Sequence, residues 1–92
     1  MKMNEIEIKF TPQERDLIID HTFTGPDLAE RLQGAEIKKN HLTAKYSAYE
    51  LDELIGFIAA EANHPDDKKI GRKLDRLFER LTDILEKEIY NQ

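Results

Sequence analysis

An apolar seam near the C-terminus constrains the fold more than any other feature of the sequence. Between residues 67 and 90, apolar residues recur at alternating steps of four and three, the spacing of a helix face that packs against a neighbour. The seam consists of Ile70, Leu74, Leu77, Leu81 and Ile84, and it is widened by Phe78, Leu85 and Ile89. We therefore predict one long amphipathic helix from about Asp67 to Tyr90.

The segment before this helix has the pattern of a second, shorter helix. Ser47 and Glu50 have the spacing of a capping box, in which each side chain accepts a hydrogen bond from the other residue's backbone. Apolar residues follow at helical spacing: Leu51, Leu54, Ile55, Ile58 and Ala62. Pro65 stops this helix, and Asp66 or Asp67 can cap the next one. The two helices are predicted to form an antiparallel hairpin.

Charge also favours the pairing of these two helices. Residues 47–63 hold four acidic and no basic residues, whereas residues 68–80 hold six basic and two acidic residues. The resulting charges of −4 and +4 are expected to meet at the rim of the seam. Gly56 is expected to let the two backbones approach closely, which would explain a glycine that weakens a helix interior by ~1 kcal/mol. On the outer face we expect the pairs Arg72–Asp75, Arg76–Glu79 and Arg80–Asp83.

The N-terminal part begins with a strand and a well-marked helix. Residues 5–10 alternate apolar with charged side chains, which is the period of a strand with one buried face. Thr11 is predicted to cap the helix, with Pro12 at its first position and Glu14 completing a capping box. This helix should end near His21.

A short helix and a β-hairpin are predicted next. The helix lies between Pro26 and Gly34, with Gly34 placed at its C-terminal cap. Two short alternating segments, together covering residues 35–47, then surround a turn at Lys39 and Asn40.

These elements give an α+β fold class: a small antiparallel sheet, made of the N-terminal strand and the β-hairpin, with helices and a long C-terminal α-helical hairpin. The 92 residues are expected to form a single domain, with the sheet part in 1–46 and the helical hairpin in 47–92. No internal repeat, low-complexity run or linker is recognised along the chain.

Composition limits the classes of partner and compartment. A net charge of −5 disfavours binding to nucleic acid and to anionic membrane surfaces. The absence of cysteine excludes disulfides, zinc–thiolate sites and a cysteine nucleophile from the chain. The N-terminus lacks the apolar run of a signal peptide, and no stretch approaches the ~20 apolar residues of a membrane span. We expect a cytoplasmic protein with no membrane contact.

The unequal lengths of the last two helices suggest self-association. The longer helix should extend over roughly 34 Å and the shorter over roughly 24 Å, so one apolar end is left over. We expect a second copy of the chain to cover it, in a homodimer. The candidate interaction residues are Leu77, Leu81, Ile84, Leu85 and Ile89. The leading functional interpretation is a non-catalytic protein–protein interaction or structural module, with an unidentified protein partner as a further candidate.

A metal-binding protein or enzyme that uses Glu61 and His64 is one alternative. Carboxylate-bridged metal sites in helical bundles use a Glu-x-x-His pair on two helices, and this chain has one such pair. A second copy would have to supply the other pair. The plainer interpretation is the polar end of a helix, where histidine is favoured by the helix dipole. No catalytic constellation is evident, and we expect neither catalysis nor a cofactor.

A DNA-binding regulator is the other alternative. Two helices followed by a hairpin match the outline of a winged helix, and the hairpin carries Lys38, Lys39, His41 and Lys45. The helix that would enter the major groove carries Asp27, Glu30 and Arg31, which leaves it almost neutral. Retention on DNA or heparin that weakens with salt would support this alternative.

Overall fold

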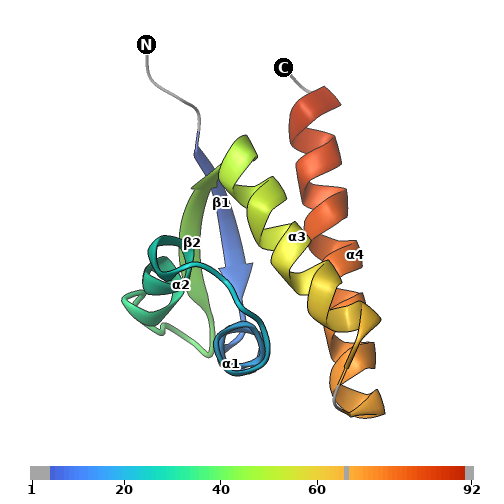
Figure 1. The fold of residues 1–92 in the computed structure, drawn as a ribbon. Helices are drawn as coiled ribbons and strands as arrows, with labels where there is room; N and C mark the ends of the chain where they lie inside the picture. Colours follow the sequence, from blue (N-terminus) through green and yellow to red (C-terminus); the bar gives the residue numbers. More distant parts are fainter. Residues whose placement is uncertain (1–4, 66, 91–92) are drawn as a thin grey trace.

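The computed structural model describes residues 5–65 and 67–90, and in this part of the chain there are two β-strands and four α-helices (Figure 1). In chain order they are β1 (Glu5–Phe10), α1 (Pro12–His21), α2 (Pro26–Gln33), β2 (Leu42–Ser47), α3 (Ala48–Asn63) and α4 (Lys68–Tyr90). The α+β class and the long C-terminal helical hairpin are confirmed.

β1 and β2 form an antiparallel ribbon with one buried face. Ile8 lies opposite Ala44 at its centre, and the residues that alternate with the buried ones are exposed. The inward side chains are Ile6, Ile8, Phe10, Leu42, Ala44 and Tyr46. On the outer face Glu7 and Lys45 form a cross-strand ion pair at 3.6 Å. The helices therefore cover one face of the ribbon, and a single apolar cluster joins residues of all six elements.

The predicted β-hairpin is reduced to its turn. Lys39 and Asn40 have φ values of 52° and 66°, and Lys38 and His41 form an isolated bridge next to them. Two successive positive φ values are typical of the type I′ turn of tight hairpins. The first arm goes no further because Ile37 is its one large apolar residue and stays 46% exposed. β2 pairs with β1 instead, where three apolar side chains of each strand are buried.

The helical hairpin begins at both predicted caps. The backbone N–H of Glu50 donates to the Ser47 hydroxyl at 3.1 Å, and the N–H of Ser47 donates to the Glu50 carboxylate at 2.9 Å. The N–H of Lys69 donates to the Asp67 carboxylate at 2.6 Å, so Asp67 caps α4. Asp66, the other candidate cap, lies outside the described residues.

The close approach in this hairpin occurs at Gly71. The prediction for Gly56 is wrong, because Gly56 is exposed and a Cβ there would meet nothing within 4 Å. Gly71 is buried, and a Cβ there would lie 2.8 Å from Cγ of Pro65. The turn thus folds its proline ring onto the start of α4, and only glycine leaves room for it.

The chain consists of two halves with the same β-α-α order. β1, α1 and α2 form the first half, and β2, α3 and α4 form the second. Residues 6–19 (IEIKFTPQERDLII) align without a gap with residues 42–55 (LTAKYSAYELDELI), with identical Lys, Glu, Asp and Ile at four positions. A shift of 36 residues also places one strand on the other, and the antiparallel pair has a local two-fold axis through Ile8 and Ala44. The expectation of a chain without an internal repeat therefore does not hold for the order of its elements.

Candidate functional site

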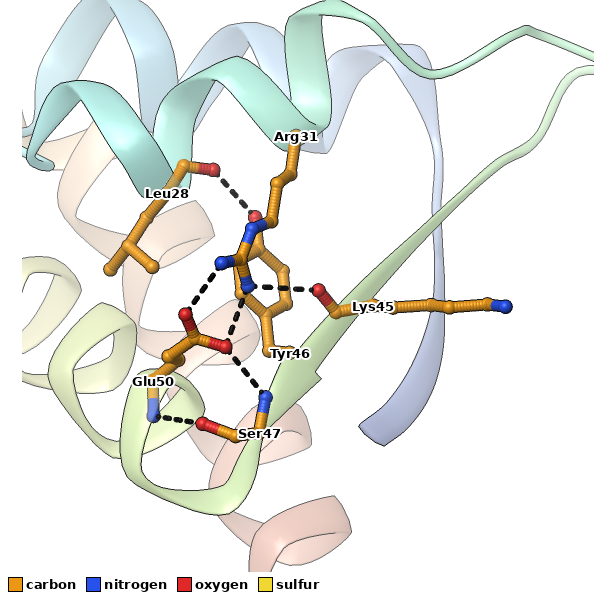
Figure 2. Close-up of polar contacts among 6 residues, drawn as sticks. All are labelled: Leu28, Arg31, Lys45, Tyr46, Ser47 and Glu50. Atoms are coloured by element: carbon orange, nitrogen blue, oxygen red, sulfur yellow. Dashed lines mark hydrogen bonds and ion pairs between the residues drawn. The ribbon is translucent and has the colours of Figure 1, made fainter. Parts of the chain in front are cut away.

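The junction of β2 and α3 holds the most strongly perturbed polar cluster (Figure 2). The guanidinium of Arg31, from α2, donates to both carboxylate oxygens of Glu50, one of them at 2.6 Å. It also donates to the backbone carbonyl of Lys45 at 3.2 Å and lies over the ring of Tyr46, 5.4 Å from its centroid. The Tyr46 hydroxyl donates to the carbonyl of Leu28 at 2.8 Å. These contacts of Arg31 and Tyr46 hold α2 against the start of α3.

Two pKa shifts follow from this packing. Hydrogen bonds from Arg31 lower the pKa of the Glu50 carboxyl to about 2, and the backbone N–H of Ser47 adds to the effect. Burial raises the pKa of the Tyr46 phenol well above its usual range, against the opposing charge of Arg31. Perturbed pKa values often mark functional sites. Here each perturbed group is satisfied by a neighbour in the same cluster, so the cluster holds the fold together.

The junction of β1 and α1 repeats this arrangement with residues from the other half. The guanidinium of Arg80, from α4, donates to both carboxylate oxygens of Glu14 at 2.9 to 3.2 Å. It also lies 5.6 Å from the centroid of the Phe10 ring. Phe10, Thr11 and Glu14 correspond to Tyr46, Ser47 and Glu50 in the internal repeat. Each half therefore supplies the arginine that holds the capping box of the other half.

This reciprocal pairing changes the predicted charge pattern of α4. Arg80 pairs with Glu14, and Asp83 pairs with Lys87 at 3.0 Å. Within residues 5–65 and 67–90, none of the three predicted i, i+3 pairs lies within 4 Å, and no ion pair links α3 to α4. The expected ion-paired face and the expected charge contacts at the rim of the seam are wrong: Glu14, from outside the hairpin, binds Arg80, and Lys87 binds Asp83.

A groove of about 570 Å³ lies between α1 and α4. Its floor is formed by Leu17, Ile70 and Leu77. α1 contributes Asp16, Asp20 and His21 to one wall, and α4 contributes Lys73 and Arg76 to the other. The Glu14–Arg80 pair also borders the groove. In the described part of the chain, no carboxylate lies within 4 Å of Lys73 or Arg76, so this basic wall is available to a ligand.

The predicted interaction residues divide into two groups. Leu77, Leu81 and Leu85 are buried in the apolar core of the single chain. Ile84 is partly buried, whereas Ile89 is 55% exposed. Figure 1 shows why: the last turns of α4 extend past the first turn of α3, which no longer covers them.

Glu61 and His64 lie together at the end of α3. His64 is the C-cap residue, and its backbone N–H donates to the carbonyl of Glu61 at 3.1 Å. The His64 side chain is exposed. Among residues 5–65 and 67–90, no group of three or more His, Asp or Glu side chains is placed to hold a metal ion. The metal interpretation of this pair stays a prediction.

The outline of a winged helix is only partly reproduced. Its expected wing lacks the first arm, and β2 pairs with the N-terminal strand. Arg31, the basic residue of the helix expected in the groove of DNA, is held by Glu50. Lys38, Lys39 and His41 are exposed around the turn, where Lys38 lies 3.9 Å from Glu36.

Sequence reasoning missed Arg31, Arg80, Gly71 and the groove. An aromatic residue followed by Thr or Ser and, three residues later, Glu occurs twice, and this repeat was the available indication of two matching sites. Comparison of the chain with protein-family models, curated protein sequences and solved structures gave no match. In the described residues, no helix has the length and apolar character that crossing a membrane requires.

Proposed function

We propose that the protein is a non-catalytic interaction or structural module that self-associates through the C-terminal part of α4. The observation that carries the proposal is the apolar end of α4 beyond the start of α3. There Ile89 is 55% exposed and Ile84 is only partly covered. Leu81 and Leu85 are packed in the core beneath this end, so the chain presents Ile84 and Ile89 from a rigid helix.

Burial of these side chains is the source of the expected affinity. Removing apolar surface from water contributes roughly 25 cal/mol per Å², and a full isoleucine side chain contributes about 1.5 to 3 kcal/mol. In a two-fold dimer each contact occurs twice, so the apolar end of α4 contributes twice to the binding free energy. A different protein could bind the same apolar end of α4. The oligomeric state of the pure chain is therefore the first quantity to measure.

Sedimentation velocity of the purified chain between about 1 and 500 μM tests the proposal. We expect a reversible dimer, and we expect Ile84→Glu to weaken it by at least about 10-fold, because a buried carboxylate would replace an apolar contact. Phe23→Glu is the matched control, since Phe23 is an apolar residue that is 87% exposed but lies in the loop between α1 and α2. A wild-type chain that stays monomeric over the whole range would refute self-association.

Leu81→Glu tests the fold and not the interface. Leu81 is fully buried in the single chain, so a carboxylate there should unfold the monomer. Circular dichroism of each variant separates the two effects: Ile84→Glu should retain the wild-type helical signal, and Leu81→Glu should lose it.

A further inference from the structure

The charges of α4 run against its own helix dipole. Residues 68–80 hold six basic and two acidic residues, a net charge of +4, and residues 81–90 hold three acidic residues and one basic, a net charge of −2. A helix dipole favours anions at the N-terminus and cations at the C-terminus. The order of charges in α4 is the reverse, so the isolated helix gives no reason for it.

α3, the helix that packs against α4, does not balance this order of charges. α3 runs antiparallel to α4, so the first turns of α3 lie toward the same end of the hairpin as the last turns of α4, which extend beyond them (Figure 1). Those first turns carry Glu50, Asp52 and Glu53. Acidic residues of both helices thus gather at one end of the hairpin, and the basic residues of α4 lie toward the other end. Two such molecules attract most strongly when they lie side by side in opposite directions.

One side of α4 combines the groove with this charge pattern. At 100° per residue, the side chains of Lys73, Leu77, Ile84 and Glu88 fall within a 60° arc of the helix. Lys73 and Leu77 line the groove, and Ile84 and Glu88 continue the same side toward the C-terminus. Along the helix this arc is first basic, then apolar and then acidic. It is therefore complementary in charge to the same arc of a second copy that runs in the opposite direction.

We infer that a second copy of the chain occupies the groove between α1 and α4, with its own α4 antiparallel to the first and its acidic end against Lys73 and Arg76. This inference rests on the self-association proposed above and assigns its geometry. With the two-fold axis between Arg80 and Leu81, Lys73 faces the partner's Glu88, and Leu77 faces the partner's Ile84. The same contacts occur a second time on the other side of the axis.

The residue nearest the axis is compatible with this geometry. Two copies of Arg80 approach one another there, which would repel if both were unpaired. Each Arg80 is already held by Glu14 of its own chain through hydrogen bonds of 2.9 to 3.2 Å. The acidic wall of α1, with Asp16 and Asp20, then faces the flank of the incoming helix that carries the partner's Lys87.

Charge reversal in two separate variants tests the inference. One variant carries Lys73→Glu, and the other carries Glu88→Lys. Neither residue is buried, so both variants should retain the wild-type circular dichroism. Each variant alone places like charges in both copies of the contact, and we expect its dimer to be at least about 10-fold weaker than that of the wild type.

Mixing the two variants should restore the dimer, because both contacts of the mixed dimer then join opposite charges. A chain with both substitutions should also dimerise with itself, yet it should not exchange with a labelled wild-type chain. Sedimentation velocity measures the first result, and energy transfer between labelled chains measures the second. Affinity should also fall as salt rises from about 50 to 500 mM.

The results separate this inference from the proposal on which it rests. A wild-type chain that is monomeric at all concentrations overturns both. A wild-type dimer that withstands both charge reversals, or variants that weaken but do not recover when mixed, overturns the antiparallel arrangement and leaves self-association through another surface.

Discussion

At the scale of residues, Arg31 and Arg80 make contacts that a lysine at the same position could not make. Arg31 and Arg80 each bind both oxygens of a glutamate and also lie over an aromatic ring. A planar guanidinium matches a carboxylate in this way, whereas an ammonium group is a single point charge. Each glutamate also caps its own helix, so the ion pair, the cap and the stacking depend on one another.

The low pKa of Glu50 makes part of the stability depend on pH. Because the folded pKa of about 2 lies below the ordinary value of 4.5, this carboxylate stabilises the fold above about pH 4.5, and the contribution is lost as pH falls toward 2. We expect Glu50→Gln to lower the free energy of unfolding by about 1 to 2 kcal/mol at pH 7, a value reduced for the 28% exposure of the side chain. Urea unfolding at pH 7 and at pH 2.5 measures both values.

Glu53→Gln is the matched control on the same helix. Glu53 is exposed, and in the described part of the chain no ion pair or side-chain hydrogen bond involves it. Its replacement should change stability by less than about 0.5 kcal/mol at either pH. If Glu50→Gln cost the same at pH 2.5 as at pH 7, the carboxylate would not be the group that Arg31 stabilises.

At the scale of elements, the helical hairpin requires a glycine at residue 71 but not at residue 56. Gly71 touches the ring of Pro65, which cannot move aside as a flexible side chain would. Gly56 faces solvent in the middle of α3, where glycine has a cost in chain entropy and no compensating contact. The two positions thus have opposite expectations for the same substitution.

We expect Gly71→Ala to destabilise the protein by about 1 to 3 kcal/mol, since the added methyl group overpacks the turn. Gly56→Ala should stabilise it by about 0.5 to 1 kcal/mol through helix propensity. Thermal unfolding of both variants beside the wild type measures the difference. Equal effects at the two sites would mean that the proline ring does not pack on α4 as described.

At the scale of the whole molecule, the two β-α-α halves complete one another. In the described part of the chain, the strand of each half pairs with the strand of the other half alone, and each half supplies an arginine to the capping box of the other. The apolar cluster likewise draws on both halves, with Leu17 and Leu32 from the first and Leu54 and Leu74 from the second. Neither half has a full set of partners by itself.

Cleavage at the exposed turn between Lys39 and Asn40 should therefore give fragments that fold together. We expect residues 1–39 alone to be unfolded, because fewer than about 40 residues rarely form a core without staples. Residues 40–92 should keep part of their helix through the hairpin. An equimolar mixture should regain a cooperative thermal transition by circular dichroism. Cooperative unfolding of the 1–39 fragment by itself would contradict this interdependence.

The sequence by itself determined the local features of this protein. Both capping boxes, the strand at residues 5–10, the turn at Lys39 and Asn40 and the seam of α4 were predictable, because each depends on residues within a few positions of one another. The internal repeat was equally visible in the residues, since it needs only an alignment of the chain with itself.

Only the tertiary structure decided which distant residues meet. Arg80 had Asp83 three residues away, yet it pairs with Glu14, which is 66 residues away. Exposed ion pairs at short spacing are worth only a few tenths of a kcal/mol, so the packing of α1 on α4 outweighs them. The same packing buries Leu77 and Leu81, leaves Ile89 exposed and opens the groove. Those outcomes depend on how whole elements fit together, and local spacing carries no information about that.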